Sequence, residues 1–163
     1  MALHFLQPDY DPSHQLMSEL SLGSHGWAML VAFTFLALAV SACLAGLRHM
    51  GASIGIQILL LVCTTSFLGA GIFPLGVASE LHISLVAAAF IAMVLVMYLL
   101  PSETLNGCKM FRLPSWTLAG STALSVLLGE NVLPMGIAQR IAAASIVLWL
   151  IWVSFLMWKC SRR

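Results

Sequence analysis

The side chains of this chain that could do chemistry are few, and most of them lie in polar stretches between long apolar runs. The acids, imidazole and guanidinium that could act together are Asp11, Glu19, Glu80, His82, Glu130 and Arg140. Carboxylates and imidazole are ligands for zinc or iron, whereas a guanidinium binds phosphate or carboxylate through its paired N–H groups. We call these six residues the polar cluster, and the elements that carry them decide whether they meet.

A metal centre is one alternative for the polar cluster. Its ligands would be acids and histidines of the polar stretches, namely Glu19, Glu80, His82, His14 and His25. The chain contains no HxxH or HExxH spacing that would place two ligands on one helix face. A haem would rely on His82 alone, because His49 falls on the other side of the membrane in the topology given below. We therefore expect no metal and no cofactor.

Arg140 has two interpretations of its own. Its guanidinium could recognise a lipid phosphate or a substrate anion. Alternatively it forms an ion pair with Glu130 or Glu19 and holds the loops over the bundle. A charge near the membrane is costly unless it is paired, so the ion pair is the interpretation we prefer.

The composition predicts the setting of these residues. Only 8% of the 163 residues are charged and 61% are hydrophobic, whereas a soluble domain carries about 25% charged residues. With a mean hydropathy of +1.01, the chain is expected to be an integral membrane protein in contact with the lipid bilayer. The net charge is +1 and there is neither a basic stripe nor a glycine-rich phosphate loop, so no nucleic-acid partner is expected.

Five apolar stretches approach or exceed the length that crosses a bilayer as a helix, which is about 20 residues. They are residues 27–47, 53–75, 83–102, 113–129 and 141–158. Residues 1–26 form a polar outer segment, in which Ser13 could cap a short helix through Leu20, and residues 130–140 form a loop. The predicted fold class is an all-α integral membrane protein, a bundle of five transmembrane helices in a single domain, 1–163.

The basic residues orient this bundle. Five spans place most of them on one side: Arg48, Lys109, Arg112, Lys159, Arg162 and Arg163. Arg140 falls on the other side, together with every acid except Glu103. By the positive-inside rule we expect a multi-pass protein of the cell membrane with the N-terminus outside and the C-terminus in the cytoplasm.

The cysteines give no sign of a metal site or disulfide framework. Cys43, Cys63, Cys108 and Cys160 show no CxxC spacing. We expect reduced thiols that serve as small packing residues.

Short motifs are spread along the chain in a characteristic order. They are Tyr10-Asp11-Pro12, Ser18-Glu19-Leu20, Gly26-Trp27, Gly71-Ile72-Phe73-Pro74, His82, Gly136 with Gln139-Arg140-Ile141, and Trp149. Over nearly the whole chain they resemble the bacterial and archaeal membrane family catalogued as domain of unknown function 998. The resemblance implies six helices, the first of them before Tyr10, and residues 1–26 lack it, so we expect a partner helix in that place. The family tends to carry an aspartate soon after its GxFP turn, where this chain has Glu80 as the nearest acid. The resemblance implies a fold and no activity.

These features favour a non-catalytic subunit or accessory protein of a membrane complex, which packs against other membrane-protein chains or against itself. Small residues recur at helical spacing and allow close helix contact, as in Ala37, Ser41 and Ala45, and in Ser84, Ala88 and Ala92. No catalytic spacing indicates an enzyme. The alternative is a lipid- or anion-handling membrane enzyme or binder whose outer-face pocket is formed by the polar cluster.

Overall fold

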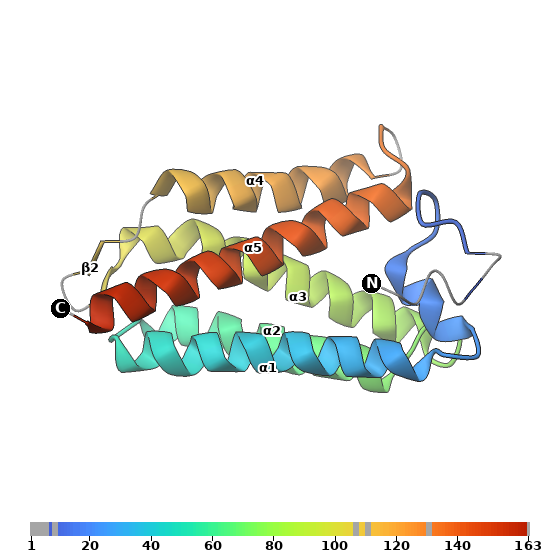
Figure 1. The fold of residues 1–163 in the computed structure, drawn as a ribbon, viewed down its shortest axis with the longest axis horizontal. Helices are drawn as coiled ribbons and strands as arrows, with labels where there is room; N and C mark the ends of the chain where they lie inside the picture. Colours follow the sequence, from blue (N-terminus) through green and yellow to red (C-terminus); the bar gives the residue numbers. More distant parts are fainter. Residues whose placement is uncertain (1–6, 8–9, 106–107, 110–111, 130–131, 163) are drawn as a thin grey trace.

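The computed structural model describes residues 7, 10–105, 108–109, 112–129 and 132–162, and within them it is almost entirely helical (Figure 1). The long helices are α1 (Trp27–His49), α2 (Ile54–Ile72), α3 (Ser79–Leu99), α4 (Arg112–Leu128) and α5 (Met135–Ser161). The shorter elements are two 3-10 helices, η2 (Met17–Leu22) and η3 (Leu100–Ser102), and an antiparallel pair of two-residue strands, β1 (Thr104–Leu105) and β2 (Cys108–Lys109). The predicted all-α fold class is confirmed.

Four helices are long and apolar enough to cross a membrane, judged by length and composition: α1, α2, α3 continued by η3, and α5. They make the chain a membrane protein. The helix α4 has 17 residues and rises roughly 25 Å, slightly less than the hydrocarbon thickness of about 30 Å. Serines and threonines also make it more polar than its neighbours, so a count of five spans does not follow from these helices alone.

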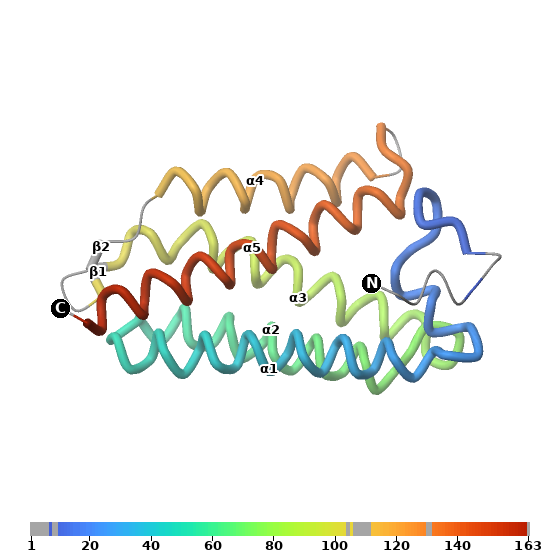
Figure 2. Tube along the Cα trace, viewed as in Figure 1, coloured from blue at the N-terminus to red at the C-terminus, as the bar shows by residue number. Residues whose placement is uncertain are grey.

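The helices pack in the order of the chain, and α1 closes the bundle against α5. In Figure 1, α1 and α5 run in the same direction and diverge toward their N-terminal ends, as the trace in Figure 2 also shows. Near their C-terminal ends they touch, because a Cβ built on Gly46 of α1 would lie 2.9 Å from Sδ of Met157 of α5. The two helices therefore form a wedge that is closed at one end.

The small residues at helical spacing lie partly inside the bundle and partly on its surface. Ala37 and Ala92 are buried, and the hydroxyl of Ser41 lies 3.5 Å from that of Thr64 on α2. The exposed members lie toward the ends of the stripes, as Ala45 does. The buried members bring α1, α2 and α3 close together, so they are not available to an external chain.

A chain of hydrogen bonds joins three helices in the core. The indole N–H of Trp149 on α5 donates to the Ser115 hydroxyl of α4 at 2.8 Å. That hydroxyl donates to the carbonyl oxygen of Met97 on α3 at 2.6 Å. Trp149, Ser115 and Met97 are each at most 1% exposed. Because no water reaches these groups, each depends on its protein partner.

The connection between α3 and α4 is bound to the start of α2. The Glu103 carboxylate accepts the backbone N–H of Ser53 at 3.0 Å and also the Ser53 hydroxyl. Ser53 is the N-cap residue of α2, where a negative charge also complements the helix dipole.

The cysteines differ from the prediction at one position. Cys43 and Cys63 are free and buried, as expected for packing residues. Cys160 is disulfide-bonded, so the prediction of a reduced thiol is wrong there. It lies in the last turn of α5 and is only partly buried. The prediction for Cys108 falls outside the described side chains.

Helices begin at other residues than predicted in the two polar stretches. The helix α5 begins at Met135, so residues 135–140 form its first turns instead of a loop. Pro134 precedes it, and proline suits a helix start because its missing N–H costs no helical hydrogen bond there. Near the N-terminus the helix capped by Ser13 is wrong, because η2 begins at Met17 with Leu16 at its N-cap.

The buried hydrogen-bond chain yields a prediction on stability. Ser115→Ala leaves the indole N–H of Trp149 without its acceptor, and Trp149→Phe removes the donor instead. We expect the two substitutions to be coupled by about 1 kcal/mol in the free energy of unfolding, the scale of a hydrogen bond between membrane helices. Reversible unfolding in mixed micelles measures this double-mutant cycle. Ser125→Ala is the matched control, because that buried hydroxyl donates within α4 to Thr122 at 3.0 Å. Equal coupling for both serines would contradict the assignment.

Candidate functional site

Arg140 lies in the second turn of α5 and binds the N-terminal part of the chain. Its Nη1 donates to the carbonyl oxygens of Gly136 at 2.9 Å, of Gln15 at 3.4 Å and of Pro12. Its Nη2 donates to the hydroxyl oxygen of Tyr10 at 2.7 Å, and the guanidinium carbon lies 5.7 Å from the centre of the Tyr10 ring. We call these five residues the Arg140 site. The cation is surrounded by peptide dipoles and a phenol, all of them neutral.

The Tyr10 hydroxyl also forms hydrogen bonds with the backbone. Its hydroxyl lies 3.0 Å from the carbonyl oxygen of Leu16 and 3.3 Å from that of Gln15. The hydroxyl therefore donates to the turn that follows it while it accepts from Arg140.

Gly136 allows the backbone of residues 12–15 to lie directly against α5. A Cβ at this position would be 2.5 Å from the carbonyl oxygen of Gln15, 2.6 Å from that of Pro12 and 2.7 Å from that of Ser13. The next N–H of α5, that of Ile137, donates to the Ser13 carbonyl at 3.1 Å. Any side chain at residue 136 would displace the segment that Arg140 binds.

Residues 10–26 are the continuously described part of the predicted polar segment 1–26, and we call them the outer segment from here on. They extend from α5 to the opposite side of the bundle. The backbone N–H of Met17 donates to Oε1 of Gln139 at 2.5 Å. Farther on, the hydroxyl of Ser21 lies 3.5 Å from the carbonyl oxygen of Leu75, between α2 and α3. Between these points η2 packs on both α1 and α5. The outer segment thus bridges the two helices where they are farthest apart.

The two acids of the outer segment serve local turns. Asp11 accepts the Ser13 N–H at 2.8 Å and faces Nδ1 of His14 at 2.8 Å. The Ser13 N–H first and then His14 lower the pKa of Asp11 from its usual value. Glu19 accepts the Leu16 N–H at 2.9 Å and closes the first turn of η2.

The predicted ion pair of Arg140 with Glu19 is not formed. Within the described residues the ion pair is that of His14 with Asp11. The Glu19 carboxylate is occupied at the start of η2, while the Arg140 guanidinium is occupied by carbonyl oxygens. Glu130, the other expected partner, lies outside the described residues.

His82 holds the corner between α2 and α3. Its side chain is 2% exposed, and Nδ1 lies 2.9 Å from the carbonyl oxygen of Ala70 and 3.0 Å from that of Phe73. Because both partners are acceptors, we assign the proton to Nδ1, which makes Nε2 of the neutral ring an acceptor. Nε2 is buried without a partner among the described residues, and the ring meets Phe33 edge-on at 5.6 Å. The imidazole therefore caps the last carbonyls of α2.

The described members of the polar cluster do not gather in one pocket. Arg140 binds the outer segment, His82 is enclosed at the corner, and Glu80 is exposed in the first turn of α3. Among the residues that the structure describes, no three metal-binding side chains come together.

An apolar groove of about 570 Å³ lies where α1 and α5 diverge. Side chains from both helices form its walls, among them Phe33, Leu36, Ala39, Ala143, Val147 and Ile151. Met17 of η2, Gln139 and Arg140 line its outer end. The volume is within the range of small-molecule sites, about 300 to 1,000 Å³. The Arg140 site and this groove are therefore one continuous feature, polar at its end and apolar along its length.

Sequence reasoning missed the partners of Arg140. Tyr10 and Gly136 were noted only as parts of the family motifs. They are 126 positions apart, and nothing in the sequence indicated that both would bind Arg140. The groove was missed as well. Its one local signal is the run Ala142-Ala143-Ala144, because alanine side chains are too small to fill a space between diverging helices.

Gly136→Ala tests how the outer segment is held. The added methyl group meets three carbonyl oxygens, so the segment must move away from α5. We expect faster hydrogen exchange and proteolysis across residues 10–22, with the helix content unchanged. Gly120→Ala is the matched control, because nothing lies within 4 Å of an added Cβ there, and alanine stabilises a helix interior by about 0.5–1 kcal/mol over glycine. Equal protection of the outer segment in both variants would show that the close approach is unimportant.

Comparison with known proteins agrees with this arrangement of motifs. A model of the family described as Protein of unknown function (DUF998) matches residues 1–156. No curated protein matches the chain, and neither does any solved structure. The residues that meet at the Arg140 site and around His82 include those on which the resemblance depends. The chain belongs to the DUF998 family.

Proposed function

We propose that this protein binds a membrane lipid in the groove between α1 and α5. The observation that carries the proposal is the groove itself, an apolar space of about 570 Å³ with Arg140 and Gln139 at one end. Lipids have the same division into a long apolar part and a polar end. Without an occupant of this kind, the facing side chains would lose packing contacts.

The length of the groove supports a lipid chain as its occupant. On α5 the lining residues Arg140, Ala143, Val147 and Ile151 follow one another on one face of the helix. From Arg140 to Ile151 this face rises roughly 16 Å, and half of the hydrocarbon core is about 15 Å thick. One acyl chain of a single leaflet would therefore reach from the polar end of the groove to its closed end.

The groove is also accessible from the side. Ala39 on α1 and Ile151 on α5 line it and are exposed, and they would face the lipid phase in a membrane. A lipid could enter from its own leaflet without passing through water.

In our proposal the chain spans the cell membrane five times, with α4 as the fifth span and the outer segment outside. The basic residues support this orientation. The disulfide at Cys160 points the other way, because such bonds persist mainly outside the cytosol. We favour the basic residues, since those of three separate segments agree.

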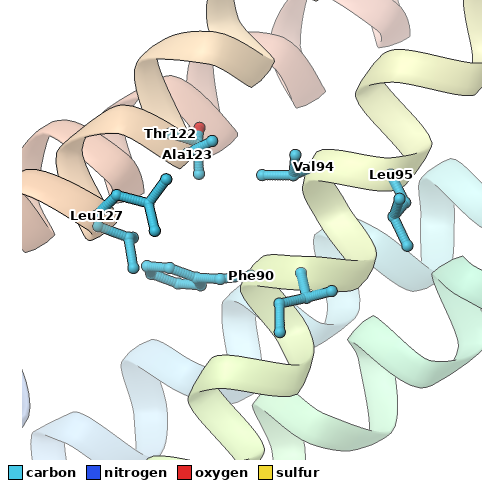
Figure 3. Close-up of a pocket in the computed structure, with 8 residues that line it drawn as sticks. Phe90, Val94, Leu95, Thr122, Ala123 and Leu127 are labelled. Carbon is cyan, nitrogen blue, oxygen red and sulfur yellow. The ribbon is translucent and has the colours of Figure 1, made fainter.

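An accessory subunit is the second candidate function, and the outer face of α4 favours it. Gly120 has nothing within 4 Å of an added Cβ. On the side of α3, Phe90 and Val94 face Thr122 and Leu127 of α4 across a groove of about 220 Å³ (Figure 3). A helix of another chain could pack on this face of α4.

Filling the groove tests the lipid proposal. Ala143→Phe places a ring in the groove, so the purified variant should lose the phospholipid that the unmodified protein retains in a mild detergent. Ala45→Phe is the matched control, because Ala45 is exposed on α1 and does not line the groove. Native mass spectrometry measures retained lipid and co-purifying chains together.

Two results would contradict lipid binding in the groove. One is equal lipid retention by both variants. The other is stoichiometric partner chains with no retained lipid, which would favour the accessory subunit instead.

A labelling experiment tests the orientation. Ser24→Cys and Arg48→Cys lie at opposite ends of α1, and both positions are exposed. In intact cells a membrane-impermeant maleimide should label the first variant and not the second, whereas permeabilised cells should show both. The reverse pattern would place the C-terminus outside, as the disulfide at Cys160 suggests.

A further inference from the structure

We infer that the lipid in the groove is anionic and that its phosphodiester headgroup binds to Arg140. The inference rests on the proposed function and adds the chemical class of the ligand. It depends on three properties of Arg140: its remaining donors, its unbalanced charge and its position at the end of the apolar face of α5.

Arg140 retains hydrogen-bond donors for a ligand. A guanidinium has five N–H groups. The two of Nη1 point to the carbonyl oxygens of Gly136, Gln15 and Pro12, and one of Nη2 points to the Tyr10 hydroxyl. Among the described residues, the N–H of Nε and the second N–H of Nη2 have no acceptor. A phosphodiester has two oxygens that can accept them.

The charge of Arg140 is not balanced within the described part of the chain. Its partners there are carbonyl groups and a hydroxyl, and no described carboxylate lies within ion-pair distance of it. A cation beside an apolar groove is costly without a counter-charge. A zwitterionic headgroup brings its own cation, whereas an anionic one supplies the missing negative charge.

The position of Arg140 matches the structure of a phospholipid. The guanidinium lies one turn before Ala143 and two turns before Val147 on the face that lines the groove. A lipid with its phosphate at Arg140 would lay an acyl chain along that face. Asp11 and Glu19 accept hydrogen bonds in their own turns, and neither forms an ion pair with Arg140 among the described residues.

The test compares two lipids that have the same acyl chains and differ in headgroup, one of them anionic and the other zwitterionic. The full chain in detergent is offered equal amounts of dioleoyl phosphatidylglycerol and dioleoyl phosphatidylcholine, and native mass spectrometry counts what is retained. We expect a preference of roughly tenfold for phosphatidylglycerol, the scale of one charge-assisted hydrogen bond. Added salt should reduce it, because a partly exposed ion pair is screened.

Three variants assign the preference to Arg140. Arg140→Gln should retain both lipids about equally, because the apolar groove remains. Arg140→Lys should keep part of the preference, because the charge stays while the planar fork is lost. Arg112→Gln is the matched control at the other end of the bundle, where the guanidinium lies over Trp116, and it should leave the preference unchanged. If Arg140→Gln does not fold, Arg140→Lys and the salt dependence of the unmodified protein decide whether the preference is due to Arg140.

The outcomes separate this inference from the function on which it rests. Equal retention of the two lipids by the unmodified protein would overturn the anionic headgroup and leave the groove intact. Retention of neither lipid would overturn both. Glu130 lies outside the described residues, and Glu130→Gln tests whether it balances the charge of Arg140. A preference for phosphatidylglycerol that appears only in this variant would show Glu130 to be the counter-charge of Arg140. Displacement of phosphatidylglycerol by inorganic phosphate, with no lipid retained, would show that a free anion is the ligand.

Discussion

A guanidinium at the edge of a membrane must be surrounded by acceptors, because its charge cannot be removed by losing a proton. In this protein backbone carbonyl oxygens meet part of that requirement at Arg140, and two of them, those of Pro12 and Gln15, come from the outer segment. The outer segment can lie there only because residue 136 is glycine. The path of the outer segment over the end of the bundle therefore depends on the side chain of Arg140 and on the absence of a side chain at Gly136.

The same contact affects how the helices pack. The core of the bundle is fixed by the hydrogen-bond chain through Trp149 and Ser115, and α1 and α5 touch at Gly46 and Met157. At their other ends the two helices are bridged by η2, which packs on both. Because η2 packs on both helices, it supports them at the end where they are apart. A groove lined by residues as small as Ala143 is the result.

Apolar composition was enough to predict the helices, since length and hydropathy alone determine whether a segment suits a membrane. It could not predict where α5 begins, because the polar side chains of Gln139 and Arg140 resemble a loop until their partners are known. The polar cluster was predicted from charge, and charge does not determine contact. His82 became a helix cap and Glu19 closed a local turn. Which partner each polar side chain finds depends on the detailed path of the backbone, and charge alone does not determine that path.

A ligand at Arg140 and the order of the outer segment cannot be independent, because both use one guanidinium. An anion that binds through Nε and the second N–H of Nη2 leaves the bonds to Tyr10 and Gly136 in place. Its negative charge also stabilises the guanidinium in this position. Binding should then make the outer segment more ordered. An anion that competes for Nη1 would instead release Pro12 and Gln15. By linkage, anything that orders the outer segment would strengthen binding in the first case and weaken it in the second, so the sign of this coupling reports which edge of the guanidinium the ligand occupies.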